Sequence, residues 1–364
     1  MKIKEIVSFF DTEYPFSFQE SYDNSGLQIG DPEKEVNSAL VCIDVTEQVL
    51  DEASAMDADI IISHHPLIFG GIKRITGQNY VQRIIHRAIQ NDIAILSVHT
   101  NLDAFSGGVN SMISDKLGLK KQQVLMPLQG KLLKLVFFVP IANAEEVRNA
   151  VFEAGAGVIG NYDKCSYNLE GKGSFRAGHG TNPYVGEKGE IHFEEEVRIE
   201  TILPGHLAKK VVNALIGAHP YEEVAYDLYP LDNTWNHAGM GMIGEFEEPL
   251  EELSFLNLLK KVFHTGCIKY TELRNRNIHK VALCGGSGSF LINVAIASGA
   301  DAFITSDLKY HQFFDAEGKI LIVDIGHYES EQFTKEIFYD MLTKKFPKFA
   351  VRLSEVNTNP INYL

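Results

Sequence analysis

Along the first third of the chain, short apolar runs alternate with segments whose apolar residues repeat at the spacing of a helix. The runs are rich in β-branched residues, as buried strands are, and cover residues 38–44, 59–63 and 93–98. The helical segments cover residues 2–11, 46–56 and 80–91, and a further helix follows Gly107 and Gly108 and reaches Leu117. Thr46 is a good N-cap for the second helix. This alternation at short spacing predicts a mostly parallel α/β sheet.

The pattern changes after about Leu125. Strands are predicted at 132–139 and 224–231, and helices at 144–154 and 204–215, with Pro204 near the start of the second helix. Polar, glycine-rich segments of strand character lie between the first helix and residue 202. The order is roughly β-α-β-β-α-β, the ferredoxin-like split motif. Residues 126–233 are therefore predicted to form a compact inserted domain.

The α/β pattern resumes after residues 235–244, whose glycines predict a linker. The predicted strands cover residues 280–284, 302–305 and 320–325. The predicted helices cover residues 254–262, a segment that ends at Ala297, and a segment that follows the last strand and extends through Leu342. Residues 1–125 and 234–364 are therefore predicted to form one discontinuous α/β domain.

Histidines and carboxylates follow several of these strands. His64 and His65 end the 59–63 run and precede Pro66, which disfavours both strand and helix. The ends of parallel strands share one edge of a sheet, and neutral imidazole is a common metal ligand. The residues of this kind are His64, His65, Asp103, His327 and Glu331. The alternative for each alone is a surface histidine, or an acid favoured by a helix N-terminus.

The number of candidate ligands bears on the number of ions. His327 and Glu331 are four residues apart at the start of a helix, which places both on one face. One ion with three or four ligands would leave some candidates unused. Two ions that share a bridging carboxylate would use all of them and leave positions for water.

Four further features carry alternatives. His99 could ligate weakly or orient a metal-bound water, but we expect it to support a ligand from outside the metal's own shell. Asp307 and His311, four apart near a strand end, are interpreted as general acid or base groups rather than solvated loop residues. The glycine-rich segment 285–289 is equally a phosphate cradle or a tight turn. Residues 219–223 are interpreted as a structural turn rather than a second ligand site.

Composition and charge disfavour several classes of function. The 364 residues include 33 basic and 48 acidic ones, and the formal charge of −15 disfavours generic nucleic-acid binding. The N-terminus lacks the pattern of a signal peptide, and no run approaches the roughly 18 apolar residues of a membrane span. The four cysteines, without CxxC spacing, are interpreted as reduced packing residues, which favours a cytoplasmic location.

The chain resembles a known family in five motifs: YDNSGLQIG (22–30), ISHHPLIF (62–69), VHTNLDAFSGGVN (98–110), ITSDLKYHQ (304–312) and DIGHYESE (324–331). These are similar to motifs of the dinuclear-metal-centre proteins of the Nif-three-like superfamily, often labelled GTP cyclohydrolase I type 2 homologues. The segment HPYEEVAYDLYPL (219–231) resembles the end of the PII-like insert of longer members. Tyr22 and Ser25 depart from the frequent family motif WDNVGLQ, which we expect to matter little.

The resemblance implies a Nif-three-like α/β core and a ligand set. It implies metal ligation by His64, His65, Asp103, His327 and Glu331. Glu331 would bridge, with His65 and Asp103 on one ion and His64 and His327 on the other. The N/O ligands suit two divalent ions of zinc, iron, manganese or nickel. The family also implies a homo-oligomer, a ring-shaped hexamer whose metal sites face an internal cavity.

Two functions follow as hypotheses. The first is a metal-dependent hydrolase of the cyclohydrolase or phosphoester type, acting on a nucleotide or related small molecule, with Asp307, His311 or His99 moving protons. The second is a non-enzymatic metal-binding, adaptor or regulatory protein, which the PII-like insert favours. DNA binding through a ring is disfavoured by the negative charge.

Overall fold

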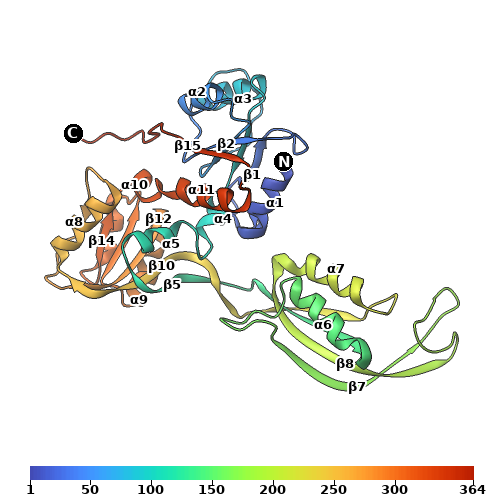
Figure 1. Cartoon of the computed structure of the whole chain (residues 1–364). Helices are drawn as coiled ribbons and strands as arrows, with labels where there is room; N and C mark the ends of the chain where they lie inside the picture. Colours follow the sequence, from blue (N-terminus) through green and yellow to red (C-terminus); the bar gives the residue numbers. More distant parts are fainter. The chain divides into compact units, whose positions relative to one another are not determined.

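The computed structural model describes all 364 residues, and the chain folds into two compact units. The first unit combines Met1–Pro127 with His237–Leu364, and the second is Leu128–Asn236. None of the helices has both the length and the apolar character needed to cross a membrane. Each unit is described in turn (Figure 1).

The first unit contains two sheets, not the single one that the alternation predicted. The first sheet has the order β1-β4-β3-β2-β15 and is parallel except for β1. Its strands are β1 (Gly26–Ile29), β2 (Ser38–Cys42), β3 (Ile60–Ser63), β4 (Ala94–Ser97) and β15 (Ala350–Leu353). The parallel core β2-β3-β4 matches the sequence prediction, whereas β1 and β15 lie in segments too short to show a period.

The second sheet has the order β11-β14-β13-β12-β10-β5. Its strands are β5 (Lys120–Gln129), β10 (Thr234–Leu250), β11 (Lys269–Tyr270), β12 (Ile278–Ser287), β13 (Ala302–Ser306) and β14 (Leu321–Asp324). The three central strands, β12, β13 and β14, are parallel, β10 runs antiparallel to β12, and β11 runs antiparallel to β14. The result is a mixed α/β fold with several sheets.

Buried apolar side chains join the two sheets through a shared layer of helices. This layer holds α1 (Ile3–Glu13), α5 (Val109–Lys116), α8 (Glu252–Phe263) and α11 (Thr334–Lys345), and its apolar residues form one cluster with both sheets. The outer face of the first sheet packs on α2 (Glu47–Ala55) and α3 (Tyr80–Gln90). The outer face of the second packs on α9 (Ile292–Ala297) and the 3-10 helix η5 (Tyr310–Ala316). The two sheets are therefore held by one core.

The observed boundaries of several helices can be compared with those that the sequence predicted. The Thr46 side chain accepts a hydrogen bond from the Val49 amide, so the predicted N-cap of α2 is confirmed. The predicted helix through Leu342 is in fact two helices, α10 (His327–Glu331) and α11, separated at Gln332 and Phe333. The short helix α4 (Thr100–Asp103) falls where the sequence indicated only a polar strand end.

The predicted linker 235–244 is wrong, because these residues belong to the long strand β10. Its glycines mark close approach, not flexibility. A Cβ on Gly239 would lie 2.2 Å from the Met126 carbonyl oxygen, and one on Gly241 would lie 2.7 Å from the Leu283 carbonyl oxygen. Glycine is therefore used here because another part of the backbone occupies the space of a side chain.

In the second unit, the elements follow the order β-α-β-β-α-β: β6 (Leu132–Pro140), α6 (Ala144–Glu153), β7 (Ser166–Arg176), β8 (Ile191–Pro204), α7 (Ala208–Ala218) and β9 (Tyr226–Leu231). The antiparallel sheet has the order β7-β8-β6-β9, and both helices pack against one face of it (Figure 1). The predicted helix 204–215 is in fact a 3-10 turn (Gly205–Leu207) followed by α7. Pro204, the last residue of β8, is the N-cap of that turn.

The close approach at Gly239 predicts a stability effect. Replacing Gly239 by Ala places a methyl group against backbone that cannot rotate away, so we expect a loss of about 1–3 kcal/mol in unfolding free energy. Gly70→Ala is the matched control, since a Cβ there meets nothing within 4 Å. Chemical denaturation of both variants measures the difference. Equal stability of the two would contradict this explanation of the glycine.

Candidate metal centre

The first sheet supplies two adjacent histidines where β3 ends. The His64 side chain is completely buried, and its Nδ1 lies 3.1 Å from the Val98 carbonyl oxygen. The His65 Nδ1 lies 2.8 Å from Oδ1 of Asp44, a residue just beyond β2. The backbone amides of both histidines are also held, by the carbonyls of Cys42 and Ile43. The pair is therefore fixed by the neighbouring strands.

The second sheet supplies the other half through α10, which begins shortly after β14. His327 and Glu331 lie on the same face of this helix, as their spacing predicted. Gly326 precedes the helix with φ +94°, and Gly286, near the end of β12, has φ +59°. A Cβ on Gly286 would lie 2.3 Å from Oε1 of Glu331, so only glycine leaves room for this carboxylate.

Carboxylates or a carbonyl hold the Nδ1 atom of every histidine near the centre. Asp23 Oδ1 lies 2.8 Å from Nδ1 of His99, and Asp307 Oδ2 lies 2.7 Å from Nδ1 of His327. An Nδ1–H that donates to such an acceptor leaves Nε2 with its lone pair. In the neutral form that binds a metal, the four imidazoles therefore share one tautomer, with the proton on Nδ1.

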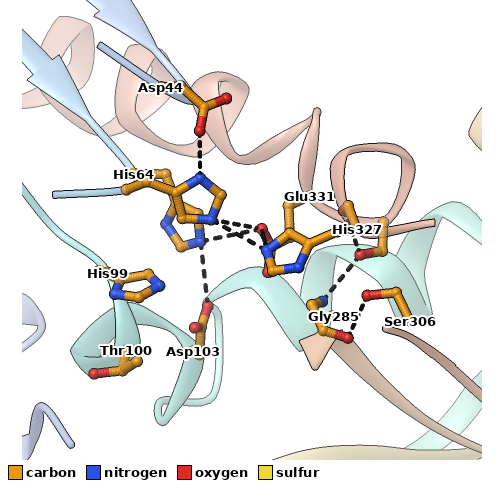
Figure 2. A network of polar contacts seen from close by, with 12 residues as sticks. Asp44, His64, His99, Thr100, Asp103, Gly285, Ser306, His327 and Glu331 are labelled. Atoms are coloured by element: carbon orange, nitrogen blue, oxygen red, sulfur yellow. Dashed lines mark hydrogen bonds and ion pairs between the residues drawn. The ribbon is translucent and has the colours of Figure 1, made fainter. Parts of the chain in front are cut away.

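The donor atoms of the five predicted ligands converge between the two sheets (Figure 2). Oε2 of Glu331 lies 3.0 Å from Nε2 of both His65 and His327, and these two nitrogens are 3.3 Å apart. Nε2 of His64 lies 3.8 Å from Glu331 Oε2 and 3.8 Å from Asp103 Oδ1. From the sequence, these residues are expected at one edge of a single sheet. In the structure they come from two sheets that face each other.

The convergent atoms fit a metal better than they fit one another. His64 Nε2 and Asp103 Oδ1 are buried and have no hydrogen-bond partner, a costly state unless something else satisfies them. Ligands about 2.1 Å from a common ion lie about 3.0–3.4 Å apart at ordinary coordination angles, and at most about 4.2 Å apart. All of the separations above fall within that limit. This set of donors can therefore hold a metal ion.

The ligands group differently from the pairing that the resemblance implied. Close sets of donor atoms are His65–His327–Glu331 and His64–Asp103–Glu331. The pairs that the resemblance implied, His65 with Asp103 and His64 with His327, do not occur together in either of these close sets. The reason is geometric: His65 points toward α10, whereas His64 points toward α4, which carries Asp103. Glu331 is the member that both sets share. A third set, His64–His65–His99, lies on the first-sheet side alone.

In the metal-free chain this cluster retains protons. Burial opposes the charge on His65, but hydrogen bonding with Asp44 and Glu331 raises its pKa to about 10. The Glu331 charge, above all, raises the pKa of His327 to about 11. Burial, followed by the Glu331 charge, raises the pKa of Asp103 to about 7. Burial also disfavours the charge of Glu331, yet the His327 imidazolium holds the pKa of that carboxyl well below its usual range. The electrostatic field of these carboxylates therefore stabilises positive charge at the convergent donor atoms.

His99 and Asp23 form a second pair beside the cluster. Asp23 also accepts from the Thr100 amide, and burial of Asp23 is outweighed by His99 and Thr100, which lower the pKa of its carboxyl. Sequence reasoning missed Asp23, although it lies in the YDNSG motif, and missed Asp44, although it ends a predicted strand. The rule that polar residues gather at strand ends could have found Asp44.

The other candidates from the sequence are Asp307, His311 and the segment 285–289, and only the Asp307 side chain hydrogen-bonds to the cluster. Asp307 has φ +58°, an uncommon backbone conformation for a residue with a side chain, and this turn aims its carboxylate at His327. His311 is exposed on η5, contacts the rings of Tyr310 and Phe314, and does not line the pocket beside the cluster. The amides of Gly285, Gly286 and Gly288 donate to side chains of the protein and are not free to bind a phosphate, and residues 285–287 form the end of β12 rather than a turn.

All four cysteines are free. Cys42 and Cys284 are buried, as the sequence indicated, but Cys267 is exposed in the loop between α8 and β11 and is not a packing residue. In the second unit, His219 lies in the predicted turn, where its Nε2 is 2.8 Å from the Phe138 carbonyl oxygen.

Fold and site together define an α/β protein with a candidate metal centre, built from histidines and carboxylates of two facing sheets. A family model described as Duf34/NIF3 (NGG1p interacting factor 3) matches residues 1–360, and the chain belongs to this family. A relative from Halalkalibacterium halodurans, named GTP cyclohydrolase 1 type 2 homolog, is 40% identical over 365 residues, 99% of this chain and 98% of the relative. A Bacillus subtilis relative of the same name is 38% identical over 367 residues, with the same coverage.

A solved structure supports the same assignment. The crystal structure of a Bacillus cereus protein related to NIF3 superposes with a TM-score of 0.88 at 39% sequence identity, and covers 100% of this chain and 99% of the other.

The raised pKa values predict how metal affinity depends on pH. His65 and His327 carry protons at pH 7, and ligation requires neutral imidazoles, so binding should release about two protons. The metal Kd should fall as pH rises from 7 to 9, by up to about 100-fold per pH unit. Below about pH 7, protonation of Asp103 should weaken binding further. Calorimetry in two buffers of different ionisation enthalpy counts the protons. A pH-independent Kd without proton release would contradict the assignment.

Proposed function

We propose that this protein is a dinuclear metal-dependent hydrolase that acts on a nucleotide or a related planar small molecule. One observation carries the proposal: buried donor atoms without hydrogen-bond partners converge beside an open pocket of about 750 Å³. A purely structural metal site would have every coordination position closed by protein. Here the pocket is lined by His65, His99, Asp103, His327 and Glu331 themselves, so a substrate could reach the centre.

Two divalent ions, of zinc, iron, manganese or nickel, would use the whole ligand set. His65 and His327 would hold one ion and His64 and Asp103 the other, with Glu331 shared. Such ions, when bound, make water acidic enough to supply hydroxide near neutral pH. The histidine tautomers are already set for this role by Asp44, Asp307 and the Val98 carbonyl.

His99 is the residue we propose to move a proton. It lines the pocket, its ring lies beside those of His64 and His65, and Asp23 fixes its orientation. An imidazole so held can accept a proton at Nε2 and pass it to a leaving group. Asp307 is proposed to act through His327 instead, and His311 has no contact that supports a catalytic role.

Aromatic side chains at the pocket support a planar substrate. Tyr22, Phe69 and Phe290 line it and are all more than half exposed. The rings of Tyr22 and Phe69 are 6.2 Å apart and inclined by 32°, and Phe69 lies 6.0 Å from His99. Exposed rings near a polar centre suit stacking with a heterocycle. The name of the relatives, GTP cyclohydrolase 1 type 2 homolog, agrees with such a substrate. Tyr22, a departure from the family motif, would thus contribute to binding.

A second function, regulation by a ligand of the inserted unit, is supported by a separate pocket. This pocket, of about 390 Å³, lies within Leu128–Asn236 and is lined by Phe175, Tyr184, Tyr221 and other residues. The β-α-β-β-α-β order agrees with a ferredoxin-like, PII-like domain over about residues 126–233, inserted into a domain of residues 1–125 and 234–364. In this second function the protein would be a non-enzymatic adaptor or regulator that contains a metal centre, and its inserted unit would bind a small-molecule effector.

The family resemblance also leads us to propose a homohexameric ring. Light scattering of the purified chain measures the assembly directly.

Metal content and turnover test the hydrolase. We expect about two divalent ions per chain, and Glu331→Gln should lose at least one ion and all turnover, because the shared carboxylate loses its charge. Glu247→Gln, the same change at an exposed position, is the control. Metal analysis and a screen of nucleotides and phosphoesters provide the measurements. A fully metallated chain that turns over no substrate would favour the regulatory function, and less than one ion per chain would exclude a dinuclear centre.

The role of His99 has a separate test. His99→Gln should lower kcat by about 100- to 10,000-fold, the usual contribution of a general acid or base, while both ions stay bound. His86→Gln on the exposed face of α3 is the matched control. Steady-state kinetics with metal analysis of each variant separates the two effects. Loss of an ion in His99→Gln, in parallel with the loss of rate, would make His99 a ligand.

A further inference from the structure

The C-terminal segment, residues 354–364, has no helix or strand, yet it is tied to both halves of the candidate metal centre. It begins at the first sheet, where the Ser354 amide donates to the Val41 carbonyl. The Lys335 ammonium donates to the Ser354 carbonyl, at 3.0 Å. From there it reaches Asp44 on the first-sheet side and Glu329 on α10. A segment held only by packing would not need polar contacts at these two places.

The first contact completes a chain of hydrogen bonds that ends at a ligand atom. The Thr358 hydroxyl donates to Oδ2 of Asp44 at 2.6 Å, while Oδ1 of Asp44 lies 2.8 Å from Nδ1 of His65. Each carboxylate oxygen of Asp44 thus has a different partner. A carboxyl group turns easily about its last side-chain bond, so the hydroxyl stops Asp44 from rotating and keeps the His65 ring in place.

The second contact reaches the helix that carries the other ligands. Asn359 Nδ2 donates to Oε1 of Glu329 at 3.1 Å. Glu329 is only 4% exposed and lies on α10 between His327 and Glu331. A Cβ on Gly326 would lie 2.2 Å from Oε2 of Glu329, so this carboxylate is packed against the start of α10. Adjacent residues of the segment therefore hold both sides of one ligand group.

We propose that Thr358 and Asn359 form a strap that positions His65 against α10, with Thr358 as a positioning residue for the ion of the His65–His327–Glu331 group. This inference rests on the proposed metal centre. The strap contacts neither His64 nor Asp103, nor the groups that orient them. Because Thr358 acts through Asp44 on His65 alone, loss of its hydroxyl should weaken binding of the ion of the His65–His327–Glu331 group and leave binding of the other ion unchanged.

The test compares hydroxyl and methyl at position 358. Thr358→Val keeps the shape of the side chain and removes its donor, whereas Thr358→Ser keeps the donor. We expect Thr358→Val to weaken the affinity for one ion by about 10-fold, at the lower end of the effect of residues that orient ligands, and Thr358→Ser to bind like the wild type. Competition against a chromophoric chelator measures both ion affinities in zinc-loaded protein. Thr343→Val is the control, because its hydroxyl donates only to backbone carbonyls of α11.

Each outcome decides the proposal. If Thr358→Val binds both ions as tightly as the wild type, or if Thr358→Ser is as weak as Thr358→Val, the strap is wrong while the metal centre stands. If the thermal unfolding of metal-free Thr358→Val falls but its ion affinities do not, the segment is only structural and the strap is again wrong. Asn359→Ala should also weaken metal binding, through α10 and the shared Glu331, which supports the strap independently of position 358. A wild-type chain that binds no ion overturns the metal centre and the strap together.

Discussion

The structure depends on a buried carboxylate. Glu331 is 2% exposed, and its Oε2 lies among the imidazoles of His64, His65 and His327. A buried charge is tolerated only where opposite charge compensates for lost hydration. The imidazoles come from both sheets, so this charge is compensated only because the two sheets face each other. Position 286, near the end of β12, must lack a side chain, because the carboxylate fills that space. Fold and centre thus impose the same requirement.

Around that carboxylate, acceptors on the far side of each ring decide what the centre can do. Asp23, Asp44 and Asp307 each hold one Nδ1 and direct the opposite nitrogen inward. None of the three would be a ligand, yet each fixes the tautomer that ligation or proton transfer needs. The division of labour among the histidines follows from position: three carry donor atoms that meet at Glu331, and His99 lies at the pocket beside them.

Much of this was visible in the sequence, for identifiable reasons. The strands that end at Ser63, Ser97 and Asp324 are continuous apolar runs, so the residues that follow them could be located before the fold was known. The spacing of His327 and Glu331 depends on helix geometry alone. By contrast, β10 was missed because its glycines are explained only by the backbone packed against them, at Met126 and Leu283. Asp44 and Asp23 were missed as partners of His65 and His99, which lie 21 and 76 residues away. The strand-end rule locates Asp44, but no local pattern identifies the partner of either aspartate.

The distance along the chain between the ligands has a consequence for how the fold is maintained. His65 and His327 bring nitrogens within 3.3 Å of each other although 262 residues separate them. Bringing together points so far apart costs an unfolded chain about 5 kcal/mol of conformational entropy. The shared apolar layer between the sheets, with α1, α5, α8 and α11, closes this loop without any ion. Hydrophobic burial therefore already offsets the entropy cost of bringing the ligands together, and a cation would bind to a site that is formed before it arrives. A zinc finger differs, because it folds only around its metal.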